Sequence, residues 1–217
     1  MNRSHNGIGL ALCLTLSLAT SCGSSDADFE QSNGVFHQQQ SLKHSPEAVM
    51  AGTCVPSGGL VDDGGFDQSL SCWVANVHMP GSALISTIND PDRPGNTILR
   101  VKNFVKQDFY KVQFYQEDRT IALEHCYCLS FRAKSSGLRA ISAQVYQGGP
   151  PWASYGLWVT PRLLTSWKPE VHCFISSSSA TDARVGFNFG DNVGTVWIDN
   201  IELDDIGAID DLDACPP

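Results

Sequence analysis

The stretch of sequence that decides the fold is GTVWIDNIEL, residues 194–203, near the C-terminus. Its β-branched and aromatic residues are bounded by Gly194 before and by the polar run 204–207 after, which predicts a strand. Asp199 is a lone acid in a run that is otherwise apolar enough to be buried. A buried carboxylate is unfavourable unless it is paired, hydrogen-bonded or bound to a metal. Asp199 therefore needs a partner elsewhere in the chain.

Outward from this stretch, the chain consists of short alternating runs separated by turn residues. LVDDGGFD at 60–67 is predicted to be the opening strand, beside the closing strand at 194–203. In the run 109–117, Val112 and Phe114 fall on one face and Gln113 on the other, as expected of a half-buried strand. Runs at 69–77, 126–134, 138–147 and 183–189 are also predicted strands. About ten such strands predict an all-β fold, a jelly-roll β-sandwich.

Length and charge limit the function classes. The chain has 217 residues, enough for one domain with tails, and a formal net charge of -9. This charge argues against a nucleic-acid partner and against a basic membrane-binding patch. The predicted segments are a signal peptide at 1–21, a flexible linker at 22–57, a β-sandwich at 58–206, and an acidic tail with a cysteine at 207–217.

The N-terminus is typical of an exported protein. A short positive start is followed by the apolar run 8–19, which is too short to span a bilayer. The sequence LATSC at 18–22 resembles a bacterial lipobox, although Ala19 stands where leucine is usual. The resemblance implies cleavage before Cys22 and a lipid on its sulfur; ordinary cleavage at the same place is the alternative. We expect a lipoprotein of the outer membrane or cell surface, touching the membrane only through its lipid, or otherwise a secreted protein.

The cysteines favour the same compartment. There are eight, of which Cys13 lies in the leader and Cys22 is the lipidation candidate. The remaining six permit three disulfides and imply an oxidising compartment. We expect a Cys54–Cys72 bridge at the start of the domain. Two further bridges are expected to join Cys173 and Cys215 to Cys126 and Cys128, in either pairing.

Several runs together resemble a known group. They are LVDDGGFD at 60–67, YKVQF at 110–114, YCLSFRAK at 127–134, WK at 167–168 and IDNIEL at 198–203. Their order resembles that of carbohydrate-binding modules of families four, nine and twenty-two, in the galactose-binding-like jelly-roll class. The resemblance spans residues 60–203 and implies a groove for a glycan chain on an open sheet face. Asp63, Asp67 and Tyr110 depart from the usual residues, and the disulfides are not part of the usual pattern.

A calcium site is one consequence of pairing the opening and closing runs. Such pairing would bring Asp63 or Asp67 near Asp199, and these carboxylates would repel one another without a cation between them. Ca²⁺ prefers oxygen ligands of this kind, and the resemblance implies a structural calcium held by Asp63, Asp67 and Asp199. The alternative is that Asp199 accepts hydrogen bonds from nearby N–H groups without a metal.

The predicted binding face combines flat aromatic rings with planar polar groups, the two features that a sugar ring requires. Trp152 follows a proline pair and is predicted to form one end of the groove, and Trp73 is predicted to form another. The other three tryptophans, Trp158, Trp167 and Trp197, are assigned to the core or rim. The alternative is that these are ordinary solvated positions. The candidate ligand-binding residues are Lys111, Gln113, Tyr115, Arg132, Gln144, Tyr146, Trp152, Arg184 and Asn188.

No catalytic constellation is apparent. The histidines lack a metal-binding spacing, and there is no nucleophile elbow or phosphate loop. Jelly-roll glycoside hydrolases need two carboxylates, and their signature resembles E-I-D-x-x-E; here Trp197 occupies the place of the first Glu. We therefore expect a monomeric, non-catalytic protein that binds polysaccharide. The alternatives are a surface structural or adhesion module that binds protein, and a glycan-degrading enzyme.

Overall fold

The computed structural model describes residues 54–57, 59–209 and 215. The predicted signal peptide, Cys22 and nearly all of the linker lie outside the described residues, as does most of the acidic tail. The only helix within these limits is the single 3₁₀ turn η1, Phe109–Lys111. It follows that the described part of the chain holds no helix long and apolar enough to cross a membrane.

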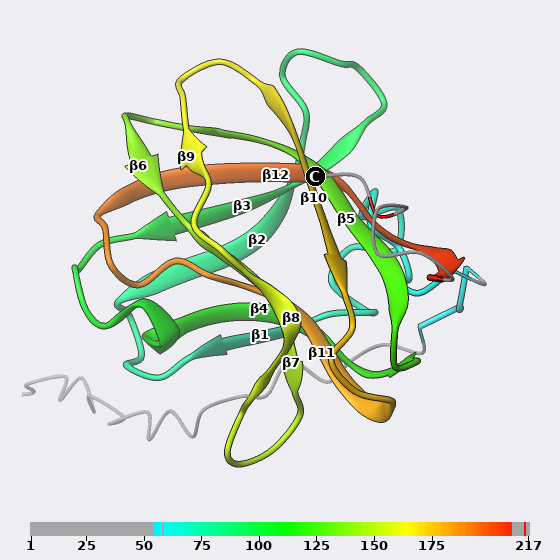
Figure 1. Cartoon of the computed structure of the whole chain (residues 1–217). Helices are drawn as coiled ribbons and strands as arrows, with labels where there is room; N and C mark the ends of the chain where they lie inside the picture. Colours follow the sequence, from blue (N-terminus) through cyan, green and yellow to red (C-terminus); the bar gives the residue numbers. More distant parts are fainter. Residues whose placement is uncertain (1–53, 58, 210–214, 216–217) are drawn as a thin grey trace, which may run out of the picture. The chain divides into compact units, whose positions relative to one another are not determined.

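Two antiparallel five-stranded sheets form the body of the protein (Figure 1). We call the first the front sheet; its strand order is β1-β4-β11-β7-β8. Its strands are β1 (Val74–Val77), β4 (Val112–Ile121), β7 (Ser142–Gln147), β8 (Ser154–Val159) and β11 (Ala180–Asn188). Sequence-distant strands are neighbours in it, because β11 lies between β4 and β7.

The second sheet, which we call the back sheet, has the order β10-β5-β12-β3-β2. Its strands are β2 (Ala83–Asn89), β3 (Thr97–Asn103), β5 (His125–Ser135), β10 (Lys168–Ile175) and β12 (Gly194–Ala208). A short ribbon of β6 (Arg139–Ala140) and β9 (Arg162–Leu163) completes the fold. The all-β jelly-roll sandwich predicted from the sequence is confirmed, and the stretch 194–203 lies in β12 at the centre of the back sheet.

The core lies between the two sheets and follows the alternation of their strands. Phe114 of β4 and Phe187 of β11 face inward from the front sheet. Phe131 of β5 and Ile198 of β12 face them from the back sheet. These side chains are almost fully buried, and the Phe131 and Phe187 rings meet edge to face with centroids 5.1 Å apart. Burial of such apolar surface is the main term that holds the layers together.

The opening run is not a strand, and this prediction was wrong. Asp63, Phe66 and Ser69 have φ angles of 48°, 63° and 61°, which an extended chain cannot contain. The run forms turns instead, and of the predicted strand 69–77 only Val74–Val77 is extended. The contact with the closing strand is nevertheless present, because Ile201 N donates a hydrogen bond to Gly64 O at 3.1 Å.

Glycine is required where these two runs meet. A Cβ atom on Gly64 would lie 1.8 Å from the carbonyl oxygen of Ile201, far inside van der Waals contact. The absence of a side chain therefore lets the opening turns lie directly against β12.

The predicted disulfides are confirmed. Cys54 is bonded to Cys72. Of the two pairings left open for the other four cysteines, the structure has Cys126–Cys215 and Cys128–Cys173. Cys128 and Cys173 lie opposite each other on β5 and β10, so this bridge staples two neighbouring strands of the back sheet.

Candidate functional site

The outer face of the front sheet carries the candidate site. Its outward positions follow from the inward ones, since Val185 and Phe187 on β11 and Phe189 directly after it are core residues and the residues between them must point outward. Strand register then places Tyr115, Gly186, Gln144 and Trp158 in one row across β4, β11, β7 and β8.

A cavity of about 500 Å³ lies over this face, and we call it the large cavity. Strands β1, β4, β7, β8 and β11, the turn η1 and the loop before β8 all contribute to it. Its lining residues are Asn76, His78, Phe109, Tyr110, Gln113, Gln144, Tyr146, Trp152, Trp158 and Arg184.

Aromatic rings stand around the rim of the large cavity. Trp152 and Trp158 each leave 54% of their surface exposed, and Tyr110 leaves 40%. Large exposed rings are unfavourable in the free protein and usually mark a contact surface. Trp152 has φ +53°, which is uncommon for a bulky residue and fixes the direction of its side chain from the loop.

Amide and imidazole groups form one polar wall. Asn76 Nδ2 donates to Gln113 Oε1 at 3.2 Å, and His78 Nε2 lies 3.4 Å from the same oxygen. The contacts join β1 to β4 and orient the Gln113 amide at the cavity edge. Its NH₂ group is then directed away from this cluster and can donate to a ligand.

The floor contains an arginine held between tyrosines. The Arg184 guanidinium lies 4.5 Å above the Tyr115 ring and donates from Nη2 to Glu117 Oε2 at 2.9 Å. Burial raises the pKa of the Tyr115 and Tyr146 hydroxyls, so both stay protonated at neutral pH. Gly186 lies between them, where a Cβ would come within 2.7 Å of Tyr115 Cβ. The floor is therefore flat and rich in hydrogen-bond donors.

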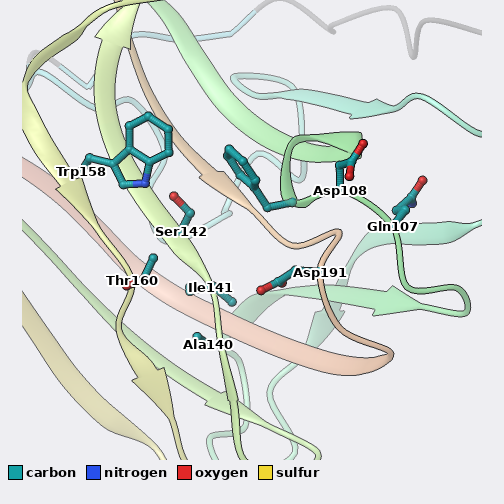
Figure 2. Close-up of a pocket in the computed structure, with 9 residues that line it drawn as sticks. Gln107, Asp108, Ala140, Ile141, Ser142, Trp158, Thr160 and Asp191 are labelled. Atoms are coloured by element: carbon teal, nitrogen blue, oxygen red, sulfur yellow. The ribbon is translucent and has the colours of Figure 1, made fainter. Parts of the chain in front are cut away.

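A second cavity of about 440 Å³, the small cavity, opens beside the first. It is lined by Gln107, Asp108, Phe109, Ala140, Ile141, Ser142, Trp158, Thr160 and Asp191. Figure 2 shows the Ser142, Thr160 and Asp191 side chains around it, with Trp158 at one end. Phe109 and Trp158 line both cavities.

Five of the nine predicted ligand-binding residues line the large cavity: Gln113, Gln144, Tyr146, Trp152 and Arg184. Two more, Tyr115 and Asn188, lie on the same face but are buried, at 7% and 1% exposed. Tyr115 is covered because Arg184 lies over its ring.

The remaining two predicted residues lie elsewhere. Lys111 belongs to η1 rather than to β4, and its Nζ lies over the Tyr110 ring at 4.8 Å. Arg132 lies on β5 in the back sheet. Alternation correctly indicated that Arg132 faces outward, but alternation cannot tell which of two sheets a strand joins.

Arg132 is the partner that Asp199 needs. Its Nε and Nη2 donate to Asp199 Oδ2 at 2.9 and 2.6 Å, and Nη2 also reaches Asp90 Oδ2 at 2.8 Å. Asn96 Nδ2 donates to the same Asp199 oxygen at 2.9 Å. The Trp167 ring covers the guanidinium at 4.3 Å. Asp199, which is fully buried, is thus neutralised by a cation supplied by the chain itself.

The carboxylates predicted to hold calcium do not form one set. Asp199 is occupied by Arg132, whereas Asp63 accepts a hydrogen bond from Gln68 N at 3.0 Å and lines a different hollow together with Asp67. Residues 54–57, 59–209 and 215 contain no group of three or more His, Cys, Asp or Glu side chains arranged to hold a metal. Asp63, Asp67 and Asp199 as placed do not fit a common ion.

Sequence reasoning missed several lining residues, left Trp158 out of the ligand-binding set, and misplaced Trp73. Asn76, His78, Phe109 and Tyr110 were not predicted. Trp158, assigned to the core or rim, lies at the rim of the large cavity, and its alternation with buried Tyr155 and Leu157 along β8 directs its ring outward. Trp73, predicted to wall the groove, is buried in the core and stacks on Phe114 with centroids 4.6 Å apart.

Comparison with known proteins agrees with this architecture. No protein-family model and no curated protein sequence matches the chain. Among solved structures, a family-4 carbohydrate-binding module, described as "CBM4 structure and function", is 19% identical with a TM-score of 0.57; the match covers 67% of this chain and 99% of the module. The enzymatically active domain of tailspike protein 4 from bacteriophage CBA120 is 16% identical with a TM-score of 0.52, over 68% of this chain and 21% of that one. The chain therefore has the jelly-roll fold found in carbohydrate-binding modules.

Proposed function

We propose that the protein is an exported, lipid-anchored lipoprotein that captures a polysaccharide in the large cavity without cleaving it. The observation that carries the proposal is that three exposed aromatic residues surround a floor of planar polar groups. They are Tyr110, Trp152 and Trp158. A sugar ring has apolar C–H faces and a rim of hydroxyls. Aromatic rings suit the faces, and amide and guanidinium groups suit the hydroxyls.

The positions of three polar side chains support such a ligand. Gln113 on β4, Gln144 on β7 and Arg184 on β11 lie on three neighbouring strands and all reach the large cavity. Sites of this size and character are typical of small-molecule recognition. The similar fold of a family-4 carbohydrate-binding module also supports this class of ligand.

Binding to a glycan panel tests the proposal. The whole chain is incubated with cellulose, xylan, mannan, chitin and mixed-linkage β-glucan, and bound protein is measured by pull-down and affinity electrophoresis. Wild-type protein is expected to bind at least one glycan, and Trp152→Ala and Trp158→Ala are expected to weaken that binding by about tenfold or more each.

A matched control is Phe104→Ala, because Phe104 is an aromatic residue 48% exposed that lines neither cavity. Its binding should equal that of wild type. Failure of wild type to bind any glycan contradicts the proposal and favours a protein-binding surface module. Release of reducing ends during incubation contradicts the absence of cleavage.

Export and lipid anchoring form a separate part of the proposal. Three disulfides support an oxidising compartment. The apolar leader and the run LATSC at 18–22 support lipidation of Cys22. Metabolic labelling with radioactive palmitate tests this in a bacterial host. Label is expected on wild-type protein and absent from Cys22→Ser, with Cys13→Ser labelled as wild type; a labelled Cys22→Ser contradicts it.

A further inference from the structure

The middle of the front face is closed by one aromatic contact. The Phe109 and Trp158 rings lie 5.7 Å apart between centroids, tilted by 51°. Both residues line the large cavity on one side and the small cavity on the other. Their contact is too close to admit another ring between them. The two cavities are therefore separated only by side chains.

Beneath the space between the cavities runs a row of polar residues. Strand register places Gln113 on β4, Asn188 on β11 and Ser142 on β7 side by side. Gln113 lines the large cavity and Ser142 the small one. Asn188 lies between them on the outward side of β11, because Phe187 and Phe189 point into the core.

The central residues of this row have no hydrogen-bond partners. Asn188 is 1% exposed and Ser142 5%. Among the residues that the structure describes, neither Asn188 Nδ2, Asn188 Oδ1 nor Ser142 Oγ has a partner. Asp191 lines the small cavity, and its buried Oδ1 likewise has no hydrogen-bond partner among the described residues.

Such a cluster is uncommon in a folded protein, where nearly all buried polar atoms are hydrogen-bonded. An apolar residue of similar size at position 188 would serve the free protein better, because it would leave no donor or acceptor unpaired. An asparagine offers two donors and an acceptor with two lone pairs. These are the groups that recognise neighbouring hydroxyls on a sugar.

The Phe109 side chain can leave this position without a change in the fold. Its backbone is fixed to the loop after β11, where Gly190 N donates to Phe109 O at 3.0 Å and Gln107 N donates to Gly190 O at 2.8 Å. Rotation about the side-chain bonds alone would separate the Phe109 ring from Trp158 while these backbone hydrogen bonds stay in place. Rotamer changes of this kind at a binding site are common.

We propose that the two cavities are halves of one groove for a linear glycan, and that Phe109 closes its centre until a long ligand displaces it. Asn188 and Ser142 then bond to the hydroxyls of the central sugar, and Asp191 accepts a hydrogen bond from the sugar in the small cavity. This inference rests on the proposed function, and it adds that the ligand must be long enough to span both cavities.

Titration with ligands of increasing length tests the inference. Cello-, xylo- and laminari-oligosaccharides, each from disaccharide to hexasaccharide, are titrated calorimetrically into the whole chain. Affinity in the series that binds is expected to rise by about tenfold or more once the ligand spans both cavities. Asn188→Leu and Ser142→Ala are each expected to remove most of that gain with ligand length.

Thermal unfolding without sugar provides the second measurement. Asn188→Leu is expected to melt at or above the wild-type temperature, because it removes unpaired buried groups. Ser130→Ala, on the outer side of β5 in the back sheet, is the control and should retain the whole length dependence. If Asn188→Leu melts well below wild type, or if Ser142→Ala keeps the full gain with length, the inference is overturned while the proposed function stands. If the wild type binds no oligosaccharide in any series, the proposed function fails and the inference with it.

Discussion

The outer faces of the two sheets differ in how the polar groups at their centres are bonded. On the back sheet, the guanidinium of Arg132 is shared between Asp90 and Asp199. On the front sheet, Asn188 and Ser142 have no partner among the described residues. Both faces belong to one sandwich and are built from strands of the same kind. The difference therefore reflects what each face must do, because folding alone favours paired groups everywhere.

Aromatic rings follow the same division. On the back sheet, Trp167 lies under Arg132 and Lys134, 4.3 and 4.8 Å from their cationic groups, and its indole N–H donates to Asp92 at 3.0 Å. On the front face, Trp152 and Trp158 leave half of their surface exposed. The Arg132 cluster, whose charges and ring are satisfied within the chain, stabilises the fold, whereas exposed rings and unpaired amide and hydroxyl groups suit the front face to binding. Changes on the back should alter stability, and changes on the front should alter binding.

Removal of the buried carboxylate is expected to have the largest effect. Asp199→Ala leaves Arg132, only 12% exposed, with Asp90 as its remaining partner. Breaking a buried ion pair in this way costs about 3–5 kcal/mol of the free energy of unfolding. Urea denaturation of the whole chain measures it. Glu202→Ala is the control, since Glu202 is exposed on the same strand and should change stability little.

The same variant tests whether the two faces are separate. Glycan affinity per folded molecule should be unchanged in Asp199→Ala. A loss of affinity together with stability would show that the back face also contributes to the site. A loss in the free energy of unfolding of less than about 1 kcal/mol would show that Arg132 is not what neutralises Asp199. A cation bound at Asp199 would then be the alternative.

The second largest effect is expected on binding. Trp158→Ala removes a ring shared by both cavities and should weaken glycan affinity by about 2 kcal/mol, or roughly thirtyfold. Because the ring is largely exposed, the free energy of unfolding should change by less than about 1 kcal/mol. Calorimetric titration and urea denaturation give the two values. A large stability loss with intact binding would reverse the assignment of the front face.

The fold was predictable because alternation marks the inward residues of each strand. Val112 and Phe114 were assigned to one side of their strand and lie in the core. The opening run was not predictable in the same way. Its residues resemble a strand in composition, but Gly64 had to approach the Ile201 carbonyl and Asp63 and Phe66 adopted left-handed turns. Close approach of two backbones is a tertiary effect that local sequence does not record.

The candidate site was predictable only in part, for a topological reason. Gln113, Gln144 and Arg184 were assigned to one face because each alternates outward, and they lie on neighbouring strands. Arg132 alternates outward as well, yet β5 belongs to the other sheet. Phe109 was included in the predicted strand 109–117 but lies in the one-turn helix η1, so strand alternation could not indicate where its side chain points.

The third prediction concerns the pH dependence of stability, which is expected to arise from Asp90 in the Arg132 cluster of the back sheet. Burial alone would raise the pKa of Asp90, but hydrogen bonds from Asp92 N–H and the Arg132 guanidinium hold that pKa below its ordinary value. Since the unfolded pKa is about 3.9, this stabilisation is complete above that pH and is lost as pH falls through the folded value. The free energy of unfolding should therefore fall as pH drops below about 4. Asp90→Asn should flatten this fall; an unchanged slope would exclude Asp90 as a source.

The smallest effect is expected at the ion pair of the front face. Arg184 Nη2 lies 2.9 Å from Glu117 Oε2, a distance comparable to the Arg132–Asp199 contacts, but Glu117 is 43% exposed whereas Asp199 is fully buried. Exposed pairs contribute about 0–1 kcal/mol, because water and salt screen them. Glu117→Gln should therefore change the free energy of unfolding by no more than about 1 kcal/mol. The Arg184 guanidinium also stays over the Tyr115 ring, so glycan affinity should change little. Urea denaturation of Glu117→Gln beside Asp199→Ala compares an exposed ion pair with a buried one. Equal losses would mean that the front face is also built for stability, and the separation of the two faces would no longer hold.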